Sequence, residues 1–513
     1  MRYFTIVIIL FLLCSCNTDD PGEQPNVLFI AVDDWNDWVG CLDGKMEVMT
    51  PNLDRMASKG VLFSEAHCAA PVCNPSRTAI LLGRMPSSTG VYENSQWLLP
   101  NVPGAISLPA FFRKNGYDVS GAGKLFHHTA GFNDPEAWDQ YYVWNERAKN
   151  NGLTEIYHYP EGPGPPDYPA SEVRDRTKRN FDFAPLDIPD ADMPDGKVAA
   201  FAANFLSKKH KKPFFLGVGM FRPHIEWYAP KKYFDMYPLD SLSLPPYLES
   251  DLEDVPEQGR RWALNTGSNH DFIKQSGNWE KAMQAYLACI SFSDAQVGKV
   301  LEALENGPNA KNTILVLWSD HGYHLGEKEH WHKSTLWYRS THVPLIMVVP
   351  GLTEAGQVIT KPVSLINLYK TLIDLCDLPE MNELDGVSMR PLLSDKDADW
   401  NQPVRVDYQP GNTCVYMDKW HYIQYSDGTG ELYDLEADPN EWENLSAQEE
   451  FTSLIDSLKG FIPLAYADPV PGKNAFDFDP LKYQWKKKED GTITNGFSDN
   501  IDFSWLINTE GDE

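Results

Sequence analysis

The chain has 513 residues, with 44 Lys and Arg against 73 Asp and Glu, which gives a formal net charge of −29 at pH 7. This balance excludes a nucleic-acid binder that holds its ligand with a basic surface. Hydrophobic residues make up 42% of the chain and aromatic residues 12%, which excludes a disordered acidic protein. The length exceeds the roughly 250–300 residues at which one core stops growing, so we expect a large domain and a smaller unit.

Residues 1–16 have the pattern of a targeting signal. Arg2 supplies a positive charge, an apolar run extends from Tyr3 to Leu13, and Leu13-Cys14-Ser15-Cys16 follows. The run is too short to span a bilayer, which needs about 20 residues. The ending resembles a bacterial lipobox, in which Cys16 becomes the lipidated first residue; the alternative is plain secretion. We therefore expect an exported protein, periplasmic or on the bacterial outer membrane, whose only membrane contact is an N-terminal lipid anchor.

Beyond a polar linker over residues 17–24, apolar runs of strand length alternate with helical patterns, such as the one over residues 279–304. Each run ends in polar residues: 26–32 in Asp33 and Asp34, 117–122 in Gly123 and Lys124, 213–220 in Arg222 and His224, and 313–319 in Asp320 and His321. The alternation predicts an α/β domain over residues 25–376, with a large, mostly parallel central sheet flanked by helices. Because ligands bind at the carboxyl ends of such strands, we expect these polar residues to meet there.

Three further segments differ from this domain in composition and in residue pattern. Residues 129–195 are rich in Pro, Gly and Asp and predict a long ordered insertion near the mouth of the site. After a helix predicted over residues 364–376, short aromatic and β-branched runs predict a smaller antiparallel-sheet subdomain over residues 377–465. Its predicted strands are 404–408, 414–417, 420–425 and 431–435, with a helix over 446–458. Residues 466–513 form a C-terminal extension to which the pattern assigns no structure.

The segment from Cys73 to Arg84 is the most informative part of the sequence. Pro75 suits the first turn of a helix, Asn74 suits its N-cap, and Gly83 suits the position just past its end. Cys73 therefore lies at a helix N-terminus, where an anion is favoured. By itself such a cysteine is either a low-pKa nucleophile or a small core residue.

The order Cys73-x-Pro75-Ser76-Arg77 followed by Gly83-Arg84 resembles the signature of the type I sulfatases, whose cysteine is oxidised to formylglycine by a maturation enzyme. The resemblance implies an alkaline-phosphatase-like fold. Similar blocks in the family's order are Pro25-Asn26-Val27 with Asp33-Asp34, Thr50-Pro51-Asn52-Leu53-Asp54, Gly123-Lys124, Ser319-Asp320-His321-Gly322 and Glu431-Leu432-Tyr433-Asp434-Leu435. The segments Gly123 to His127, Arg222-Pro223-His224 and Thr341 to Leu345 look most like the iduronate 2-sulfatase branch. One position departs from the pattern, because Leu82 stands where the family usually has Thr.

The resemblance implies one divalent cation held by Asp33, Asp34, Asp320, His321 and the formylglycine made from Cys73. Clustered carboxylates are costly without a cation, and oxygen ligands select a hard ion. Ca²⁺ is favoured over Mg²⁺ because it tolerates irregular coordination. Without the other blocks, Asp33-Asp34 would be about as well explained as a helix cap.

The resemblance also assigns catalytic roles. Arg77 donates to the hydrated aldehyde, and His127 helps to deprotonate it. Lys124, Lys333 and His224 hold the sulfate oxygens and the bridging oxygen, and His224 or Lys333 protonates the leaving alcohol. Taken singly, a lysine in a loop is usually solvated and a histidine after proline is usually structural. Arg222 is a candidate for binding the other anionic group of a sugar substrate.

The predicted function is hydrolysis of sulfate esters of a sulfated polysaccharide or oligosaccharide, glycosaminoglycan or algal, with a 2-O-sulfated uronate as the preferred unit. The expected partners are this carbohydrate and the maturation enzyme, with no nucleic acid. One alternative is a formylglycine phosphonate or phosphate ester hydrolase of the same fold. The other is an inactive surface protein that binds sulfated glycans and retains Cys73 as a thiol.

Overall fold

The computed structural model describes residues 24–42, 46–127, 131–142, 171, 181–264, 270–479 and 482–497. At its centre lies an eight-stranded sheet in the order β13-β2-β12-β9-β1-β7-β4-β5. These strands are β1 (Asn26–Val32), β2 (Val61–Phe63), β4 (Asp118–Gly123), β5 (Gln140–Tyr142), β7 (Phe214–Gly219), β9 (Thr313–Ser319), β12 (Leu345–Val348) and β13 (Gln357–Ile359). Only β12 runs antiparallel to its neighbours. The prediction of a mostly parallel sheet is confirmed.

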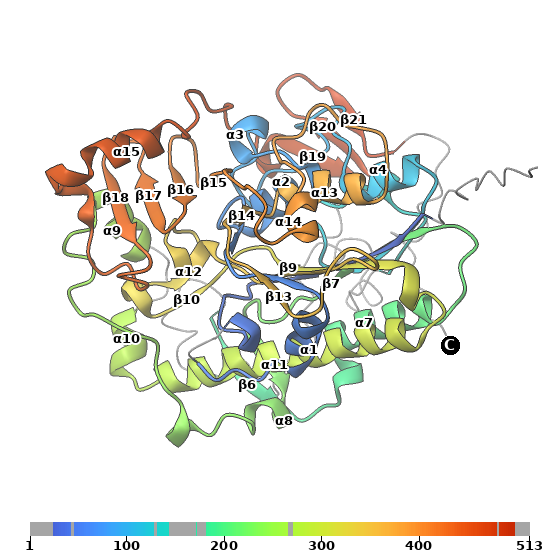
Figure 1. Ribbon diagram of the computed structural model, residues 1–513, viewed down its shortest axis with the longest axis horizontal. Helices are drawn as coiled ribbons and strands as arrows, with labels where there is room; N and C mark the ends of the chain where they lie inside the picture. The colour runs from blue at the N-terminus through green and yellow to red at the C-terminus, as the bar shows by residue number, and fades with distance from the viewer. Residues whose placement is uncertain are drawn as a thin grey trace, which may run out of the picture.

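The central strands are continuous apolar runs because both faces of the sheet are covered. In the view of Figure 1, α1, α7 and α11 lie below the strands, and α2, α4 and α13 lie above them. These helices are α1 (Pro51–Lys59), α2 (Cys73–Leu82), α4 (Leu108–Lys114), α7 (Pro194–Leu206), α11 (Trp279–Asn306) and α13 (Asn367–Leu375). Every residue of β1 and β9 is buried. The predicted bounds of these two strands match the structure, and the predicted helix over residues 279–304 corresponds to α11.

Shorter elements complete this layered domain. The remaining helices are α3 (Pro86–Thr89), α8 (Lys231–Phe234), α9 (Glu257–Leu264), α10 (His270–Gln275), α12 (Tyr338–Thr341) and α14 (Arg390–Ser394). Two-stranded pairs are formed by β3 (Ala66–His67) with β14 (Val363–Ser364), β6 (Phe183–Leu186) with β8 (Trp227–Pro230), and β10 (His324–Leu325) with β11 (Trp331–His332). Of the predicted insertion, β5, β6 and the start of α7 are described; residues 143–170 and 172–180 lie outside the described part.

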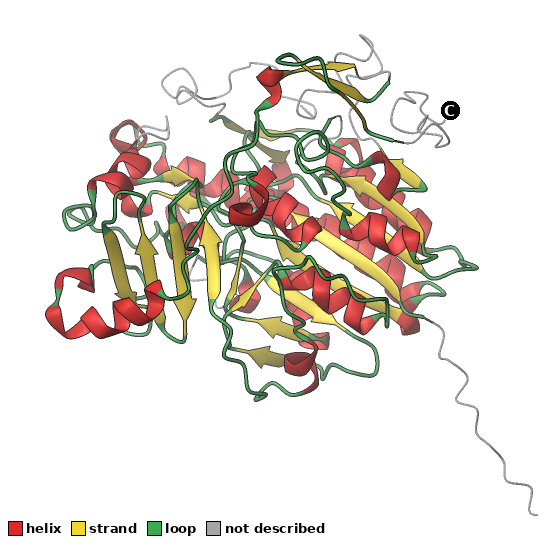
Figure 2. Cartoon of the chain, turned by 90° about the horizontal axis from the view of Figure 1, so that it is seen from above, coloured by secondary structure: helices red, strands yellow, loops and turns green. Residues whose placement is uncertain are grey.

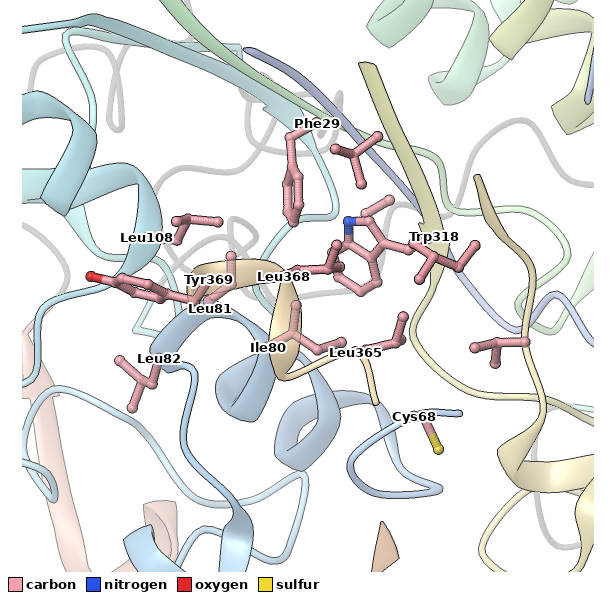
Figure 3. Close-up of a cluster of buried hydrophobic side chains, with 14 of the residues drawn as sticks. Phe29, Cys68, Ile80, Leu81, Leu82, Leu108, Trp318, Leu365, Leu368 and Tyr369 are labelled. Atoms are coloured by element: carbon pink, nitrogen blue, oxygen red, sulfur yellow. The ribbon is translucent and has the colours of Figure 1, made fainter. Parts of the chain in front are cut away.

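Helix α2 is fastened to the sheet by a hydrophobic cluster. Figure 3 shows Ile80, Leu81 and Leu82 of α2 in one cluster with two side chains of the sheet and with residues at and just before the start of α13. The labelled partners are Phe29, Trp318, Leu365, Leu368 and Tyr369. Leu82 is 2% exposed. The position at which the sequence departs from the family pattern is therefore a core position, where an apolar side chain packs well.

Asp294 of α11 caps the N-terminus of α1 from outside that helix. The Thr50 side chain makes no capping hydrogen bond. The Asp294 carboxylate instead accepts from the backbone N–H of Asn52 at 3.2 Å and of Leu53 at 2.9 Å. Burial raises the pKa of Asp294 to about 6, while the hydrogen bonds from Asn52 and Leu53 oppose the shift. One carboxylate thus joins two helices of the lower layer.

Replacing Asp294 by alanine should lower the free energy of unfolding by about 1–3 kcal/mol. The substitution leaves the buried N–H of Leu53 without an acceptor, and an unsatisfied buried donor costs about that much. Urea denaturation measures the change. Asp271→Ala is the matched control, because Asp271 is exposed on α10. Equal midpoints for the two variants would contradict the capping role.

The C-terminal subdomain is an antiparallel sheet in the order β15-β16-β17-β18, packed by α15. Figure 2 shows it beside the central sheet. Its elements are β15 (Val404–Asp407), β16 (Thr413–Met417), β17 (Trp420–Gln424), β18 (Gly430–Asp434) and α15 (Thr452–Lys459). The predicted helix began too early, at residue 446. Residues 445–451 instead form two short 3₁₀ turns, the first capped by the Asn444 side chain, which accepts from the N–H of Ser446.

The C-terminal extension contains a sheet that the sequence pattern did not predict. Its strands are β19 (Phe476–Asp479), β20 (Gln484–Lys487) and β21 (Ile493–Asn495). Trp485 is fully buried, with its ring 6.1 Å from that of Trp97. The Tyr483 hydroxyl donates to the backbone carbonyl of Asn133 at 2.8 Å. The extension therefore packs on the α/β domain.

The predicted targeting segment lies outside the described residues, and Cys16 lies there too. Across the described ranges, every helix is too short or too polar to cross a membrane. Five cysteines in these ranges, Cys68, Cys73, Cys289, Cys376 and Cys414, are buried free thiols.

Candidate active site

Polar residues from four strands meet at the carboxyl edge of the central sheet. Asp33 and Asp34 follow β1, Lys124 follows β4, and Asp320 follows β9; all four side chains are buried. Lys124 Nζ lies 2.5 Å from Asp33 Oδ2, and the Asp34 N–H donates to Asp320 Oδ1 at 3.1 Å. One ring nitrogen of His224, which follows β7, lies within 4.8 Å of a carboxylate oxygen of Asp33 and of one of Asp34. The structure thus brings together the residues that the sequence places at separate strand ends.

Gly123 allows the backbone to place Lys124 at the end of β4, close to β7. Its φ is +76°, and a Cβ atom there would lie 2.0 Å from the backbone oxygen of Gly219 in β7. Only glycine fits such a close approach of two backbones. The Lys124 N–H then donates to that same Gly219 oxygen at 3.0 Å, which fixes the lysine beside the ends of β4 and β7.

Helix α2 begins at Cys73 itself, two residues before the predicted first helical position at Pro75. Val72, in extended conformation, takes the N-cap position, so the prediction that Asn74 caps the helix is wrong. The Asn74 side chain instead donates to the carbonyls of Glu93 and Gln96 at 2.9 and 2.7 Å. The prediction for Gly83 is confirmed, because it closes the helix with φ +64°. Cys73 retains its place at a helix N-terminus.

The Cys73 sulfur is surrounded by basic nitrogens. Lys333 Nζ lies 3.2 Å from Sγ and His321 Nε2 lies 3.3 Å from it. Cys73 is fully buried, and burial raises the pKa of its thiol, while Lys124 and Lys333 oppose the shift. The unmodified side chain is therefore a protonated thiol at neutral pH. Burial thus acts against the low-pKa thiolate that a helix-terminal cysteine would otherwise suggest.

Arg77 joins three strand ends. Its Nε donates to Asp320 Oδ2 at 2.8 Å, and its Nη2 donates to Asp33 Oδ1 at 2.9 Å. Its Nη1 donates to the backbone carbonyls of Lys124 and Leu125. Burial alone would lower the pKa of Arg77, but Asp320 and Asp33 raise it, so the guanidinium stays charged. The structure thus gives Arg77 a role in holding the carboxylates.

The two carboxylates that follow β1 have pKa values shifted in opposite directions. Burial raises the pKa of Asp33, but Lys124 and Arg77 outweigh it and hold that pKa well below its usual range. Burial raises the pKa of Asp34 to about 7, although Lys333 Nζ lies 2.6 Å from its Oδ1. Asp34 Oδ2 is buried without a hydrogen-bond partner. Asp34 therefore lacks part of the positive charge that a buried carboxylate needs.

The donor set fits a hard divalent cation. One oxygen, nitrogen or sulfur atom from each of Asp33, Asp34, Cys73 and His224 lies within 4.8 Å of the others, and Cys73, Asp320 and His321 form a second such group. His321 Nδ1 lies 3.0 Å from the Gly322 carbonyl, so Nδ1 donates and Nε2 keeps its lone pair for a ligand role. The unpartnered Asp34 oxygen completes the fit.

The loop after β7 holds His224 through Arg222. Arg222 donates from Nε to the Tyr228 carbonyl at 2.8 Å and from Nη1 to the His224 carbonyl at 3.2 Å. His224 Nδ1 lies 2.7 Å from the Ile225 carbonyl and donates to it. Burial lowers the pKa of His224 well below its usual range, and Lys333 and Lys124 lower it further. Neutral His224 therefore presents a lone pair on Nε2.

His127 is buried three residues beyond Lys124, on the same loop after β4. Its ring stands edge-on to Phe132, with the two ring centres 5.1 Å apart. The contact packs the imidazole against the segment that contains Phe132.

Two supporting residues carry no signal in the sequence. His330 lies with Nε2 2.9 Å from the Lys333 carbonyl, and Tyr286 of α11 donates its hydroxyl to the Asp34 carbonyl at 2.7 Å. On either side of Lys333, His332 and Ser334 have φ of +83° and +79°. Left-handed conformations of such residues are strained, and they persist where the surrounding structure imposes them. Lys333 is thus held by a constrained turn.

Comparison with known proteins agrees with this geometry. The sulfatase family model matches residues 25–378, and a model of the N-sulphoglucosamine sulphohydrolase C-terminal region matches residues 326–463. A sulfatase of Formosa agariphila is 39% identical, covering 95% of this chain and 96% of its own. The iduronate 2-sulfatase of Mus musculus is 33% identical, covering 69% of each chain.

Solved structures share the fold at lower identity. A 2-O GAG sulfatase has a TM-score of 0.66 at 22% identity, covering 85% of this chain and 91% of that one. The phosphonate monoester hydrolase of Agrobacterium radiobacter has a TM-score of 0.69 at 20% identity, covering 89% and 99%. Fold and site thus define a hydrolase of the alkaline-phosphatase-like class. The chain belongs to the sulfatase family, and it is a sulfuric ester hydrolase.

Proposed function

We propose that this sulfatase removes sulfate esters from a sulfated polysaccharide or oligosaccharide, glycosaminoglycan or algal, and that it acts on O2 of a uronic acid. The observation that carries the proposal is the buried group of basic side chains around Cys73, which suits one tetrahedral anion. The likeness to iduronate 2-sulfatases supports the uronate. Because a phosphonate hydrolase shares the fold, fold alone does not select the sulfate ester.

We propose that Cys73 acts as formylglycine, produced by a maturation enzyme. The raised pKa of the thiol supports this, because a protonated buried thiol is a poor nucleophile. As formylglycine, position 73 would supply a hydrated aldehyde with two hydroxyls: one would attack sulfur and displace the alcohol oxygen, and deprotonation of the other would release sulfate and restore the aldehyde. His127 is the proposed base for that second hydroxyl.

Asp33, Asp34, Asp320 and His321, with the side chain at position 73, would hold one Ca²⁺; Mg²⁺ is the less favoured ion. Bound there, the cation supplies positive charge beside the nucleophilic oxygen. Lys124 and Lys333 pair with Asp33 and Asp34 in the structure. Once the carboxylates have another counter-charge, these two ammonium groups can bind the sulfate oxygens.

Lys333 is the proposed acid for the leaving oxygen. Burial lowers its pKa, but Asp34 and its neighbours outweigh this and raise the pKa well above its usual range, so Lys333 carries a proton at neutral pH. His224 is neutral, with its only N–H directed to Ile225. His224 is thus suited to accept a hydrogen bond near the bridging oxygen.

Replacing Lys333 by alanine should reduce kcat more for a sugar sulfate than for nitrophenyl sulfate. A sugar alkoxide needs a proton to leave and a nitrophenolate does not, and general acid catalysis contributes about 10²–10⁴-fold. Steady-state kinetics on both substrates measures the difference. Lys124→Ala is the control, because loss of a sulfate contact should affect both substrates alike. If Lys333→Ala lowers kcat equally for the sugar sulfate and for nitrophenyl sulfate, Lys333 is not the acid.

Replacing Arg222 by glutamine should weaken kcat/KM for a carboxylated substrate about tenfold or more beyond its effect on nitrophenyl sulfate. The expectation follows from the proposal that the guanidinium binds the uronate, since a charged hydrogen bond is worth about 1.5–3 kcal/mol. Arg222 also holds two backbone carbonyls. If both substrates lose equally, Arg222 only supports the loop of His224.

The substrate proposal is tested by sulfate release from a panel of defined oligosaccharides sulfated at O2 of the uronate, at O6 or at nitrogen. Release from the 2-O-sulfated uronate at the non-reducing end is expected. Faster turnover of a phosphonate monoester than of every sulfate would favour the phosphonate hydrolase. Tight glycan binding without any release would favour an inactive glycan-binding protein. We further propose export to the periplasm or outer membrane with a lipid on Cys16.

A further inference from the structure

An exposed lysine run stands out on this acidic protein. The loop that joins α7 to β7 carries Lys208, Lys209, Lys211 and Lys212, and all four side chains are exposed. His210 between them is partly buried, stacked on Phe205 with the ring centres 4.2 Å apart. This stacking fixes the middle of the loop and leaves the lysines on its outer side.

The loop lies where the chain enters the central sheet. The Phe214 N–H at the start of β7 donates to Asn26 Oδ1 at the start of β1, at 3.0 Å. Asn309 donates its Nδ2 to the Lys208 carbonyl at 2.9 Å, and Asn312 donates to the Gln24 carbonyl at 3.2 Å. Exposed lysines therefore lie on both sides of the first described residue, since Lys311 in the 3₁₀ turn Ala310–Asn312 precedes β9.

Among the described residues, this basic patch, defined as Lys208, Lys209, Lys211, Lys212 and Lys311, has little local compensation. One ion pair is recorded within it, from Lys212 to Asp118 at 3.4 Å. The catalytic residues lie at the carboxyl ends of the same strands. The patch and the active site thus lie at opposite ends of the strands of the central, mostly parallel sheet.

We propose that the basic patch docks on an anionic phospholipid bilayer and turns the active site away from the membrane. The proposal goes beyond sulfate hydrolysis and draws on the proposed lipid at Cys16. Residues 17–24 can span at most about 30 Å, so an anchor at Cys16 holds the patch close to the lipid headgroups. A basic patch beside an anionic bilayer adds an electrostatic contact to such an anchor.

The overall charge of −29 does not oppose this contact strongly. Exposed charges farther away than the Debye length of about 8–10 Å are largely screened. Each lysine close to an anionic surface strengthens binding about fivefold. Docked in this way, the enzyme presents its catalytic edge to a polymer that approaches from the surrounding solution.

The test uses the chain from residue 17 onward, which keeps every described element and carries no lipid. We expect it to co-sediment with vesicles of phosphatidylglycerol and phosphatidylcholine at about 0.1 M salt, where the Debye length is about 10 Å, and not with phosphatidylcholine alone. The triple variant Lys208→Gln, Lys209→Gln, Lys211→Gln should bind at least about tenfold more weakly. Turnover of nitrophenyl sulfate should stay unchanged, because the substitutions lie at the other edge of the sheet.

The matched control is Lys486→Gln, Lys487→Gln, Lys488→Gln, which removes the same charge from another lysine run. In that run Lys487 pairs with Glu489 at 3.0 Å and Lys488 with Asp477 at 3.5 Å. Its vesicle binding should equal that of the unsubstituted chain. Equal binding by the two triple variants, or equal binding to both vesicle types, would overturn the proposal. So would lysine-dependent binding to an immobilised sulfated polysaccharide without binding to vesicles, which would assign the patch to the polymer.

Discussion

The Cys73→Ser protein should fold like the wild type and lose at least about 10³-fold in kcat. Serine preserves the size of the side chain at the first residue of α2, but it is not the substrate for oxidation to formylglycine. The sulfur lies between Lys333 and His321, so the lost group stands at the centre of the site. Thermal unfolding and sulfate release measure the two effects separately.

Cys68→Ser is the matched control for this experiment. Cys68 is another fully buried thiol of the same domain, and it contacts the Ser340 carbonyl outside the site. This variant should retain turnover. Mass spectrometry of the peptide that contains position 73 should show formylglycine in active wild-type protein. An equally active preparation with only unmodified Cys73 would show that the proposed mechanism is wrong.

Removing the metal should abolish turnover and lower thermal stability together. A ligand that binds only the folded state at 100 times its Kd stabilises that state by about 2.7 kcal/mol, so a chelator removes stability on that order. Added Ca²⁺ should restore both properties. Asp320→Asn should resemble the chelated protein, because Asp320 is a proposed ligand and also the partner of Arg77 at 2.8 Å. Activity assays and calorimetry follow the two properties.

Asp251→Asn separates the metal role from the general effect of breaking a buried ion pair. Asp251 pairs with Lys328 at 2.6 Å, and both side chains are buried outside the catalytic edge. This variant should lose stability but keep its response to Ca²⁺. Two tightly bound zinc ions in elemental analysis of active enzyme would contradict the calcium proposal and favour a phosphatase-like centre.

The local pattern of the sequence predicted the central sheet and the place of the site. A strand that is buried on both faces appears in the sequence as a continuous apolar run, which is why the first and last residues of β1 and β9 were predicted correctly. The polar residues after those strands had to share one edge because parallel strands end there. The segment around Cys73 added the helix N-terminus, although the cap was misplaced by two residues.

The remaining features depend on contacts between distant segments. Arg77 binds Asp33 and Asp320, 44 and 243 residues away in the chain, and no spacing rule predicts such a bridge. The left-handed residues beside Lys333 are His and Ser, not glycine, so composition gave no signal of the turn. The extension was left without structure because the three short strands of its sheet gain their burial from Trp97 and its neighbours.

The burial of helix α2 sets the timing of the proposed maturation. Cys73 is fully buried, and so is every other residue of α2, including Leu82. A modifying enzyme has to bind the chain around Cys73 in an extended conformation. In the native protein these residues form helix α2, which is buried on all sides. Oxidation therefore has to precede closure of the core, while the new chain is still open. The fraction of chains that become active then depends on two rates: the rate at which the modifying enzyme oxidises Cys73, and the rate at which residues 73–82 fold onto the sheet.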